Sequence, residues 1–527
     1  MWRYLDQKIN KAASTLIRDH ESYAKEVHKE NKRRSRRSIS ISDNDKLPLL
    51  HPSTWDLHPG FNPYLVRSRH KCIAYTISHS LKNQTYTPSR PAGFKVPKPS
   101  GGERTISTFQ ISDEVVSRYL FRSLVRKNLP ILSSHSYAYR PDRGPYNAIH
   151  HIKAEFSHEH RIFIAEYDFK KFFDNISHSY LLETIDEIGI IKSPLEDYLI
   201  KKFLEVPAPY LSNEKKGPSE YSSSYGLTDT PPPCERKGIP QGTSISLFLA
   251  NIAALKLDQK LEKLGVGFVR YADDTLIWST DYGKICDAAS ALHELSDQIG
   301  SPINSKKSSG IRLLVRGEVE KAEISFTKQV DYLGHRFGLG PNTTQIKPEL
   351  VQRIKKRVNN LIYTNLLLEP LRNNQDPDRI SGNIDEDYKI LILQLRRYLY
   401  GSLTEQEVRR FQIGAVSKIS FQGIMSFFPL IDDNEQLEAI DKWIAARIWL
   451  AMRKRFKILK RSSLNTPDPH SLSKNELINY SYKSPSGQEV QDLRIPSIQR
   501  IVNVISQGVS NHGFEVVSDK IPLYMYS

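Results

Sequence analysis

The segment that most constrains the fold is Tyr271-Ala272-Asp273-Asp274, which stands between two apolar runs, GVGFV and TLIWS. Apolar residues on both sides of a short polar pair are typical of a β-hairpin whose tip carries the two carboxylates. Two adjacent acids beside buried β-structure are unfavourable unless something pairs with them. A divalent cation is a natural partner, because Mg²⁺ prefers carboxylate oxygens and leaves room for phosphates. An ordinary Asp-Asp turn is the alternative interpretation.

A third acid, Asp168, ends the apolar run IFIAEY, which predicts a strand. The next residues, FKKFFDNISH, predict a helix whose first turn lies near Asp174 or Asn175. An acid at the end of a buried strand is a common position for a catalytic group, although a structural role at the helix start competes. If Asp168 and Asp273 lie on neighbouring strands, their carboxylates can bridge two metal ions roughly 3.5–4 Å apart. Such a pair of ions activates an attacking hydroxyl group and stabilises a leaving pyrophosphate.

Two further motifs are typical of nucleotide binding. The run KGIPQGTS at 237–244 precedes the helical pattern ISLFLANIAALKLD, and its glycines predict a tight turn through which the backbone approaches a nucleotide or a template base. The run KVPKPSGGER at 95–104 predicts a basic hairpin that can hold a triphosphate. Taken singly, the first motif also fits a loop before a buried helix, and the second fits a solvated turn.

The composition favours a nucleic-acid partner. Lys and Arg total 75 against 59 Asp and Glu, a formal net charge of +16, and contacts of Lys and Arg with phosphate dominate nucleic-acid affinity. A soluble basic protein without such a partner is the alternative. The three cysteines are widely separated, which excludes a disulfide framework or a cysteine-rich zinc site and predicts a reducing, cytoplasmic location. We expect no signal peptide and no membrane, since no apolar run approaches about 20 residues.

The first part of the chain changes pattern near residue 47. Residues 1–46 predict an amphipathic helix and then a basic run at 32–37, which is either a solvated linker or an RNA contact. Between residues 90 and 340 the chain interleaves short β-rich runs with helical patterns, and this indicates an α+β domain. The stretch at about 206–237, rich in Pro, Ser, Gly and Tyr, predicts a long loop within it.

From about residue 346 the pattern is helical. Strong helices are predicted at 346–361 and 435–457, and the polar stretches 371–387 and 461–489 predict linkers or surface loops. Both helices carry basic residues beside a narrow apolar stripe, and we expect these faces to bind RNA, with an ordinary solvated face as the alternative. The basic residues concerned are Lys347, Arg353, Lys355, Lys356 and Arg357 in the first helix, and Arg447, Arg453, Lys454, Arg455, Lys457, Lys460 and Arg461 in and after the second.

The order of these motifs resembles that of reverse transcriptases, most closely the group II intron and retron side of the family, over roughly half of the chain. HSYAYRPDRGPYNAI resembles the second block of the family, EYDFKKFFDNISH the metal-binding block and GIPQGTSISLFLANI the template-gripping block. INSKKS at 303–308 resembles the segment that carries Asn and Lys, and DYLGHRF at 331–337 resembles the primer-grip block.

The resemblance implies an α+β fold of right-hand polymerase type with a ferredoxin-like palm sheet. It places fingers and palm at 47–340, the start of the thumb at 341–370, and a helical thumb and C-terminal domain at 371–527. The implied activity is that of an RNA-directed DNA polymerase, a nucleotidyltransferase that uses two Mg²⁺ ions, with Mn²⁺ as the alternative ion. The implied partners are an RNA template, deoxynucleoside triphosphates and the DNA product; a homo-oligomer or a partner protein is left open.

The resemblance also implies roles for individual residues. Asp168 and Asp273 are metal ligands, Asp274 is bound less directly, and Phe169 offers its backbone carbonyl. Phe173 holds the position of an aromatic steric gate against the ribose 2′-hydroxyl group, with core packing beside Phe172 as the alternative. The implied nucleotide-binding residues are Lys98 and Arg104 over the triphosphate, Gln241 and Gly242 along the nucleotide and template, and Lys307 as proton donor to the pyrophosphate. Tyr271 and Gly334 are the implied primer residues, and Lys355, Lys356 and Arg357 are the predicted template contacts.

The chain also departs from the intron-type pattern. Leu247 follows Ser246 where that pattern has proline, three cysteines cannot build a Cys/His-rich endonuclease tail, and we recognise no RNase H-like acidic set beyond residue 340. The helical C-terminus, with FQGIMSFFPLIDDNEQLEAIDKWIAARIW at 421–449, resembles bacterial defence-associated reverse transcriptases of the "unknown group" type. That resemblance implies antiphage defence with a dedicated non-coding RNA. A template-independent or protein-primed DNA polymerase of the same fold, and a group II intron-type maturase that binds intron RNA, are the alternatives.

Overall fold

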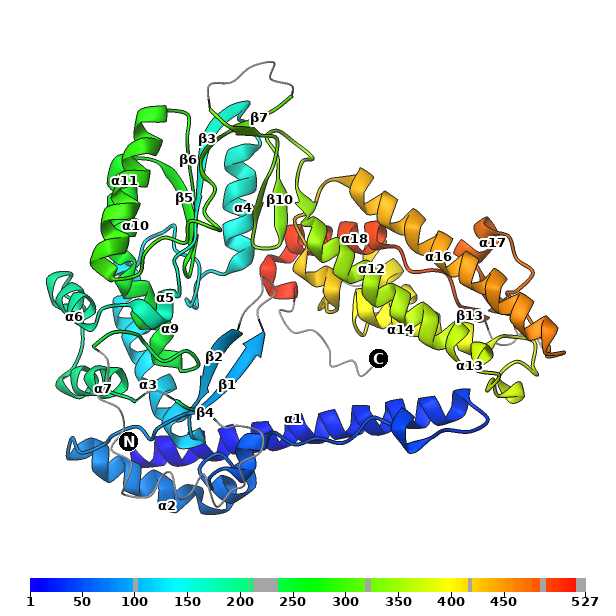
Figure 1. Ribbon diagram of the computed structural model, residues 1–527, viewed down its shortest axis with the longest axis horizontal. Helices are drawn as coiled ribbons and strands as arrows, with labels where there is room; N and C mark the ends of the chain where they lie inside the picture. The colour runs from blue at the N-terminus through cyan, green and yellow to red at the C-terminus, as the bar shows by residue number, and fades with distance from the viewer. Residues whose placement is uncertain are drawn as a thin grey trace. The chain divides into compact units, whose positions relative to one another are not determined.

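The computed structural model describes residues 1–97, 103–207, 209–211, 236–317, 324–415, 419–483 and 490–517 (Figure 1). The chain forms two compact units. Unit 1 comprises Met1–Glu21, Leu50–Ile152 and Glu159–Lys328, and unit 2 comprises Ser22–Leu49, Lys153–His158 and Gln329–Ser527. Helices and sheets occur in both units, so the predicted α+β class is confirmed.

The centre of unit 1 is a five-stranded sheet with the strand order β5-β6-β3-β7-β8. β5 (Gly267–Tyr271) and β6 (Asp274–Ser279) form the hairpin that the sequence predicts. β3 (Arg161–Tyr167) lies antiparallel to β6 on one side and to β7 (Gly310–Val315) on the other. The edge strand β8 (Phe326–Thr327) runs parallel to β7.

Helices cover this sheet and form the core of unit 1. α10 (Leu255–Leu264) and α11 (Tyr282–Ile299) lie on one face of it, where Phe268 and Ile277 are fully buried (Figure 1). α9 (Ser244–Ala253) has eight buried residues and packs against α3 and α6, which explains its nearly unbroken apolar sequence. Other helices of the unit include α2 (Pro63–Lys82), α3 (Ile111–Asn128), α6 (His178–Glu187), α7 (Pro194–Leu204) and most of α4 (Pro145–Phe156).

A smaller sheet of unit 1 contains the predicted basic hairpin. β1 (Ala92–Pro97) pairs antiparallel with β2 (Glu103–Thr108), and the short strand β4 (Tyr210–Leu211) runs parallel to β1. The turn of this hairpin, including Lys98, and most of the predicted loop at 206–237 lie outside the described residues.

One local prediction is confirmed only in part, and one interpretation is wrong. The predicted helix begins with Asp174 in its first turn, but α5 (Phe172–Asn175) is only a single turn, and the longer helix α6 begins after Ser177, whose hydroxyl accepts from the backbone of Tyr180. The basic run at 32–37 is not a linker, because α1 (Trp2–Arg37) continues through it. Within unit 2, the buried carboxylate of Glu30 attracts these basic side chains and so favours the helix. Its partners are Arg33 at 2.5 Å, Arg34 at 3.3 Å and Arg37 at 3.7 Å.

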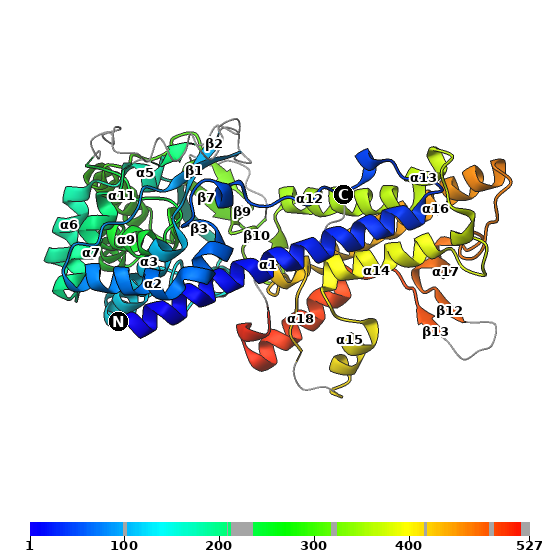
Figure 2. The same cartoon turned by 90° about the horizontal axis from the view of Figure 1, so that it is seen from below.

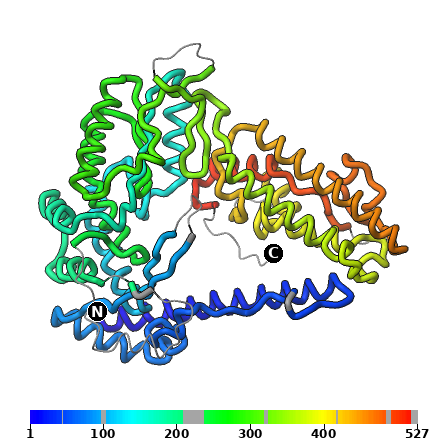
Figure 3. The backbone as a smooth tube through the Cα atoms, viewed as in Figure 1, coloured from blue at the N-terminus to red at the C-terminus, as the bar shows by residue number. Residues whose placement is uncertain are grey.

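Unit 2 is mostly helical. α12 (Pro348–Ile362) and α16 (Asn434–Arg461) confirm the two strong helices that the sequence predicts. α12 packs against both α14 (Glu386–Tyr400) and α16, and the three run side by side in Figures 2 and 3. α18 (Ile498–His512) packs on α16. The shorter elements are α13 (Leu368–Leu371), α15 (Glu405–Gln412), α17 (Lys474–Ile478), and the strands β9 (Val330–Tyr332), β10 (His335–Phe337), β11 (Gln345–Ile346), β12 (Ser481–Lys483) and β13 (Val490–Asp492).

The sequence predicts linkers or surface loops for the polar stretches at 371–387 and 461–489. In the structure each stretch also contributes residues to a buried ionic cluster. Arg455 of α16 is fully buried, and its Nε lies 2.7 Å from Asp385 Oδ2. Asp387 and His470 complete the cluster, at 2.9 Å from Arg455 Nη2 and 2.8 Å from Asp385 Oδ2. A buried guanidinium requires such partners. Arg455 therefore does not belong to the exposed basic face to which the sequence pattern assigns it.

None of the helices in the part of the chain that the structure describes has both the length and the apolar character required to cross a membrane.

Candidate active site

Three acids lie at the same end of neighbouring strands in unit 1. Tyr167 is paired with Thr275, so Asp168, one residue later, is next to Asp274, one residue earlier on β6. Tyr271 is paired with Asp274 across the hairpin, and Ala272 and Asp273 form its two-residue turn. Ala272 has a φ of 60°, as this tight type of hairpin turn requires. The strand register thus brings Asp168, Asp273 and Asp274 to one place.

The three carboxylates repel one another. Loss of hydration, followed by the charges of Asp273 and Asp168, raises the pKa of Asp274 to about 6, although part of this residue is exposed. Burial and the charge of Asp168 raise the pKa of Asp273, while Lys307 and Arg104 oppose that rise. A raised pKa means that the ionised form of the carboxyl group is unfavourable in the folded protein. A bound cation stabilises that ionised form.

The segment 303–308 holds Asp168 in place. Lys307 Nζ lies 2.9 Å from Asp168 Oδ2, and Asn304 Nδ2 donates to the same oxygen at 3.1 Å. The backbone N–H of Asp168 donates to Ser308 Oγ at 3.2 Å. The hydrogen bond with Asp168 is the main cause of a raised pKa of Lys307, so this ammonium group remains charged. Asn304 and Ser308 were not among the predicted site residues, although the motif that carries Lys307 contains both.

A cavity of about 810 Å³ has Asp168 and Asp273 in its wall, a volume within the usual range for small-molecule sites. Six other predicted residues line the same cavity: Arg104, Phe169, Phe173, Gln241, Gly242 and Lys307. The wall also contains residues that sequence reasoning did not single out, among them Tyr139, Lys171 and Asn304. Gly334, Lys355, Lys356 and Arg357 belong to unit 2.

The loop before α9 is fixed against this cavity by its backbone. Gly242 has a φ of +126°, and a Cβ atom there would lie 2.0 Å from the carbonyl oxygen of Ser107. The N–H of Ser107 donates to the carbonyl of Gln241 at 2.7 Å, and Gln241 Nε2 donates to Asp174 Oδ1 at 3.0 Å. Only glycine permits this close approach of the loop to β2.

Two adjacent aromatic residues of α5 line the cavity and differ in burial. Phe172 is 2% exposed and belongs to the core, whereas Phe173 is half-buried and packs against that core. Their ring centroids are 6.1 Å apart in an edge-to-face arrangement. Phe173 therefore has a cavity-facing surface as well as a packing contact.

A buried ion pair supports the hairpin that carries Asp273. Arg270, 1% exposed, donates to both carboxylate oxygens of Asp258 at 2.6 Å and to the carbonyl oxygen of Ala272 at 2.9 Å. The same guanidinium contacts Asn251 at 3.3 Å, and Asn251 Nδ2 donates to the carbonyl of Ala138 at 2.9 Å, next to Tyr139 in the cavity wall. The ion pair between Arg270 and Asp258 was not predicted from the sequence. An arginine within an apolar strand does indicate that a buried acid lies close to it.

The donor set fits a hard divalent cation. Carboxylate and carbonyl oxygens are the ligands that Mg²⁺ prefers, and the raised pKa values of Asp273 and Asp274 indicate negative charge that lacks sufficient neutralisation. As the side chains stand, no group of three acidic, histidine or cysteine residues within the described ranges is close enough to hold an ion. The ammonium group of Lys307 is instead the cation in contact with Asp168.

Comparison with known proteins identifies relatives of part of the chain. Residues 96–337 match the family described as reverse transcriptase (RNA-dependent DNA polymerase). The group II intron-encoded protein LtrA of Lactococcus lactis subsp. cremoris is 30% identical over 205 residues, which cover 38% of this chain and 30% of that protein. An uncharacterized 91 kDa protein in the cob intron of Schizosaccharomyces pombe is 29% identical over 194 residues, 36% of this chain and 21% of that protein. The chain thus spans less than a third of these curated relatives.

Among solved structures, that of telomerase from Candida tropicalis in complex with a fragment of telomeric RNA covers 75% of this chain and 68% of its own, with 13% identity and a TM-score of 0.36. The corresponding structure from Candida albicans has 12% identity and a TM-score of 0.35, and covers 76% of this chain and 68% of its own.

Proposed function

Because the chain carries a reverse transcriptase domain over residues 96–337, we propose that it is an RNA-directed DNA polymerase that adds deoxynucleotides by a two-metal mechanism. The observation that carries this proposal is the meeting of Asp168, Asp273 and Asp274 at one sheet end, beside a cavity of about 810 Å³. In this proposal Asp168, Asp273 and the carbonyl of Phe169 hold Mg²⁺, with Mn²⁺ as the alternative, and Asp274 is bound less directly.

The residues around the cavity have distinct roles in this proposal. Bound Mg²⁺ ions supply charge neutralisation at the primer 3′-hydroxyl and the triphosphate. Arg104 and Lys307 attract the triphosphate, and Lys307 Nζ, which keeps its proton, donates it to the leaving pyrophosphate. Gln241 and Gly242, which line the cavity, are proposed to lie along the nucleotide and template. Lys98, which lies outside the described residues, is proposed to bind the triphosphate together with Arg104. Tyr271 and Gly334 are proposed to contact the primer.

The proposal is tested with the purified full chain, a DNA primer annealed to an RNA template, and Mg²⁺ or Mn²⁺. We expect incorporation of the complementary deoxynucleotide only, and none without the template. Incorporation that ignores the template sequence would favour the template-independent alternative. DNA covalently attached to the protein would indicate priming from a protein hydroxyl group.

We also propose that 47–340 forms fingers and palm, 341–370 begins the thumb, and 371–527 completes a helical thumb and C-terminal domain. The proposed setting is the cytoplasm of a bacterium, in antiphage defence with a dedicated non-coding RNA, and the support is the resemblance of the helical C-terminus to defence-associated enzymes. Sequencing the nucleic acid that copurifies with the chain tests this setting. A single abundant RNA and its DNA complement are expected, whereas intron RNA would indicate the maturase alternative.

Changing Phe173 to alanine is expected to admit ribonucleotides. The phenyl ring lines the cavity, and its removal leaves space for a 2′-hydroxyl group, so discrimination against ribonucleotides should fall at least about tenfold. The measurement compares kcat/KM for a ribonucleotide and its deoxy counterpart. Phe326→Ala removes the same ring from an exposed site on β8 and should leave the ratio unchanged. A parental ratio in the Phe173 variant would assign this ring to core packing alone.

The proposed RNA-binding face of unit 2 combines basic and aromatic side chains. Lys355 Nζ of α12 lies 5.3 Å from the ring of Trp443 on α16, and Arg447 lies 5.9 Å from the same ring. Arg447 Nε also donates to Asn359 Oδ1 at 3.3 Å, so contacts between the two helices order these cations. An ordered row of cations loses less entropy on binding phosphates than a row of independent lysines.

Replacing Lys355, Lys356 and Arg357 together with alanine should weaken RNA binding and reduce its salt dependence. Each lost phosphate contact lowers the slope of log affinity against log salt by about 0.7 to 0.9, so the slope should fall by about two. A salt titration of RNA binding measures this, and extension of a short primer–template should continue. Arg409, Arg410 and Lys474 lie outside α12 and α16, and their combined alanine variant is the charge-matched control. Equal slopes for parent and triple variant would show an ordinary solvated face.

A further inference from the structure

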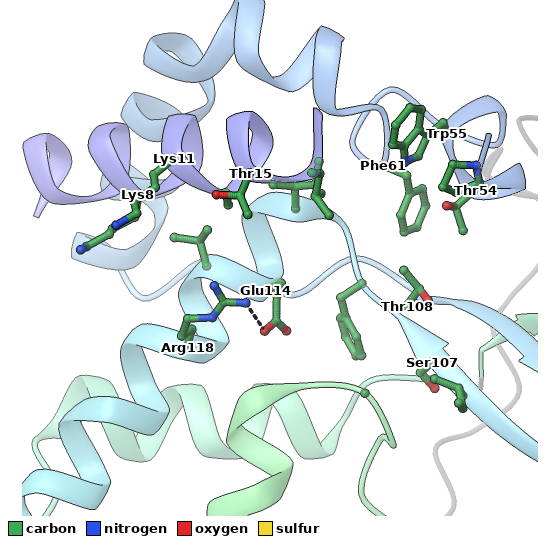
Figure 4. Close-up of a pocket in the computed structure, with 18 of the residues that line it drawn as sticks. Lys8, Lys11, Thr15, Thr54, Trp55, Phe61, Ser107, Thr108, Glu114 and Arg118 are labelled. Atoms are coloured by element: carbon green, nitrogen blue, oxygen red, sulfur yellow. Dashed lines mark hydrogen bonds and ion pairs between the residues drawn. The ribbon is translucent and has the colours of Figure 1, made fainter. Parts of the chain in front are cut away.

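Unit 1 contains a second cavity, of about 550 Å³, that the proposed chemistry does not use. Its walls come from the first turns of α1, the turn Ser53–Asp56 and Phe61, the end of β2, and α3. Figure 4 shows Lys8 and Arg118 at one end of it and Trp55 and Phe61 at the other. The cavity is therefore basic at one end and aromatic at the other.

The basic end has a surplus of positive charge. Lys8, Lys11, Arg118 and Arg122 line the cavity, and among the described residues of its lining Glu114 is the one acid. Glu114 Oε1 already accepts from Arg118 at 3.1 Å and from Ser244 Oγ at 2.8 Å. The single carboxylate of Glu114 thus offsets one of the four cationic side chains. The other three suit a ligand with several negative charges, such as successive phosphates of a nucleic-acid strand.

The aromatic end has a fixed geometry. The ring of Trp55 is in edge contact with His20 at 5.0 Å and with Tyr64 at 5.9 Å, which sets its orientation. Trp55 is half-buried and keeps surface toward the cavity, while Phe61 and Phe109 are buried beside it. A held aromatic face near a basic groove is the combination that binds single-stranded nucleic acid, because bases stack on the rings while phosphates meet the cations.

The second cavity adjoins the wall of the candidate active site. Ile106 and Gly242 line both cavities. The backbone bond from Ser107 N–H to the Gln241 carbonyl, at 2.7 Å, closes this shared wall. A strand that leaves the active-site cavity past Gly242 therefore has the second cavity next to it.

We propose that this second cavity binds the unpaired nucleic-acid strand next to the active site, with bases against Trp55 and phosphates on Lys8, Lys11, Arg118 and Arg122. The inference rests on the proposed polymerase function, since it takes the strand to be the template before it is copied. A free nucleotide presents the same chemistry, a base and phosphates, and the experiment distinguishes the two sources.

The test measures binding of a fluorescent primer–template to the full chain by anisotropy, without nucleotides or catalysis. Two RNA templates are compared, one ending flush with its primer and one with a single-stranded 5′ extension of about six nucleotides. The parent should bind the extended template about tenfold more tightly. Lys11→Ala with Arg122→Ala should remove most of this advantage, as should Trp55→Ala. Arg69→Ala with Lys71→Ala changes two exposed cations of α2 outside the cavity and should retain it.

An extension that improves binding equally in the parent and the cavity variants would overturn the proposal. A second outcome would overturn the proposal in favour of a nucleotide site. In that outcome Trp55→Ala no longer binds a free deoxynucleoside triphosphate, but still binds the template with the single-stranded 5′ end more tightly than the flush template. Because the readout is binding, its result is separable from the polymerase proposal. If the chain bound the template with the single-stranded 5′ end more tightly but never added a nucleotide to the primer, the proposal for the second cavity would be supported and the proposed polymerase activity refuted.

Discussion

Replacing Asp273 and Asp274 together with asparagine is expected to abolish DNA synthesis, with a loss of at least about 10³-fold. Asparagine keeps the size of each side chain but cannot supply a charged oxygen to Mg²⁺. The hairpin itself should form as before, because it depends on the pairing of β5 with β6 and on Arg270. The measurement is the rate of deoxynucleotide incorporation at saturating Mg²⁺.

The same double variant is expected to be slightly more stable than the parent without metal. The pKa of Asp274 in the folded protein, about 6, is above the value near 3.9 of an unfolded chain. Because the folded protein holds this proton more tightly than the unfolded chain, Asp274 contributes stability at low pH, where it is protonated. That contribution is lost as the pH rises through about 6. The ionised Asp274 carboxylate therefore destabilises the fold at neutral pH. After allowance for the exposure of Asp274, removing the charges should add roughly 1 kcal/mol to the free energy of unfolding at pH 7.5.

Thermal unfolding with and without Mg²⁺ completes the test. Mg²⁺ should stabilise the parent and leave the double variant unaffected, because a ligand stabilises only the state that binds it. Asp287→Asn with Asp297→Asn removes two exposed acids of α11 and should change neither activity nor the effect of Mg²⁺. Near-parental incorporation by a folded Asp273/Asp274 variant would refute the two-metal assignment.

Local sequence pattern predicted the elements that present the acids. Apolar residues on both sides of a polar pair predicted the β5–β6 hairpin, a short apolar run predicted β3, and a period close to 3.6 predicted α12 and α16. These signals lie within a few residues of one another, so they can be read before any tertiary contact is known. The helix start near Asp174 was predicted, but not that α5 ends after a single turn and that α6 begins separately after Ser177.

Contacts between distant segments could not be predicted in this way. Asp385 and His470 lie in polar stretches that read as loops, yet both are buried because Arg455 of α16 needs them as partners. Asn304 is in the site because β7 follows it in the chain and pairs with β3, which ends directly before Asp168. Tyr139 lies in the cavity wall next to a carbonyl that Asn251 holds, more than a hundred residues away. Each of these positions is determined by a partner, not by its neighbours in sequence.

Changing Arg270 to lysine is expected to cost about 3–5 kcal/mol of stability and to weaken the use of Mg²⁺. The loss of stability follows because a lysine cannot donate at once to both oxygens of Asp258 and to the Ala272 carbonyl, so buried groups lose their partners. The effect on Mg²⁺ follows from the carbonyl bond, since Ala272 directly precedes Asp273 in the turn. A looser turn should raise the Mg²⁺ concentration for half-maximal activity several-fold, more than it changes the KM for the template.

Arg455→Lys is the matched control for that variant, because it makes the same change in an ion pair of unit 2 that is buried to the same degree. Both variants should unfold at lower denaturant concentration than the parent. Only Arg270→Lys should alter the Mg²⁺ dependence of the fraction that remains folded, because only Arg270 contacts the turn that carries Asp273. If both variants showed the parental Mg²⁺ dependence, the Arg270–Asp258 pair would be a support of the core of unit 1 with no part in positioning the acids. If both shifted it equally, general loss of stability would be the cause, and the hairpin would not depend on Arg270 in particular.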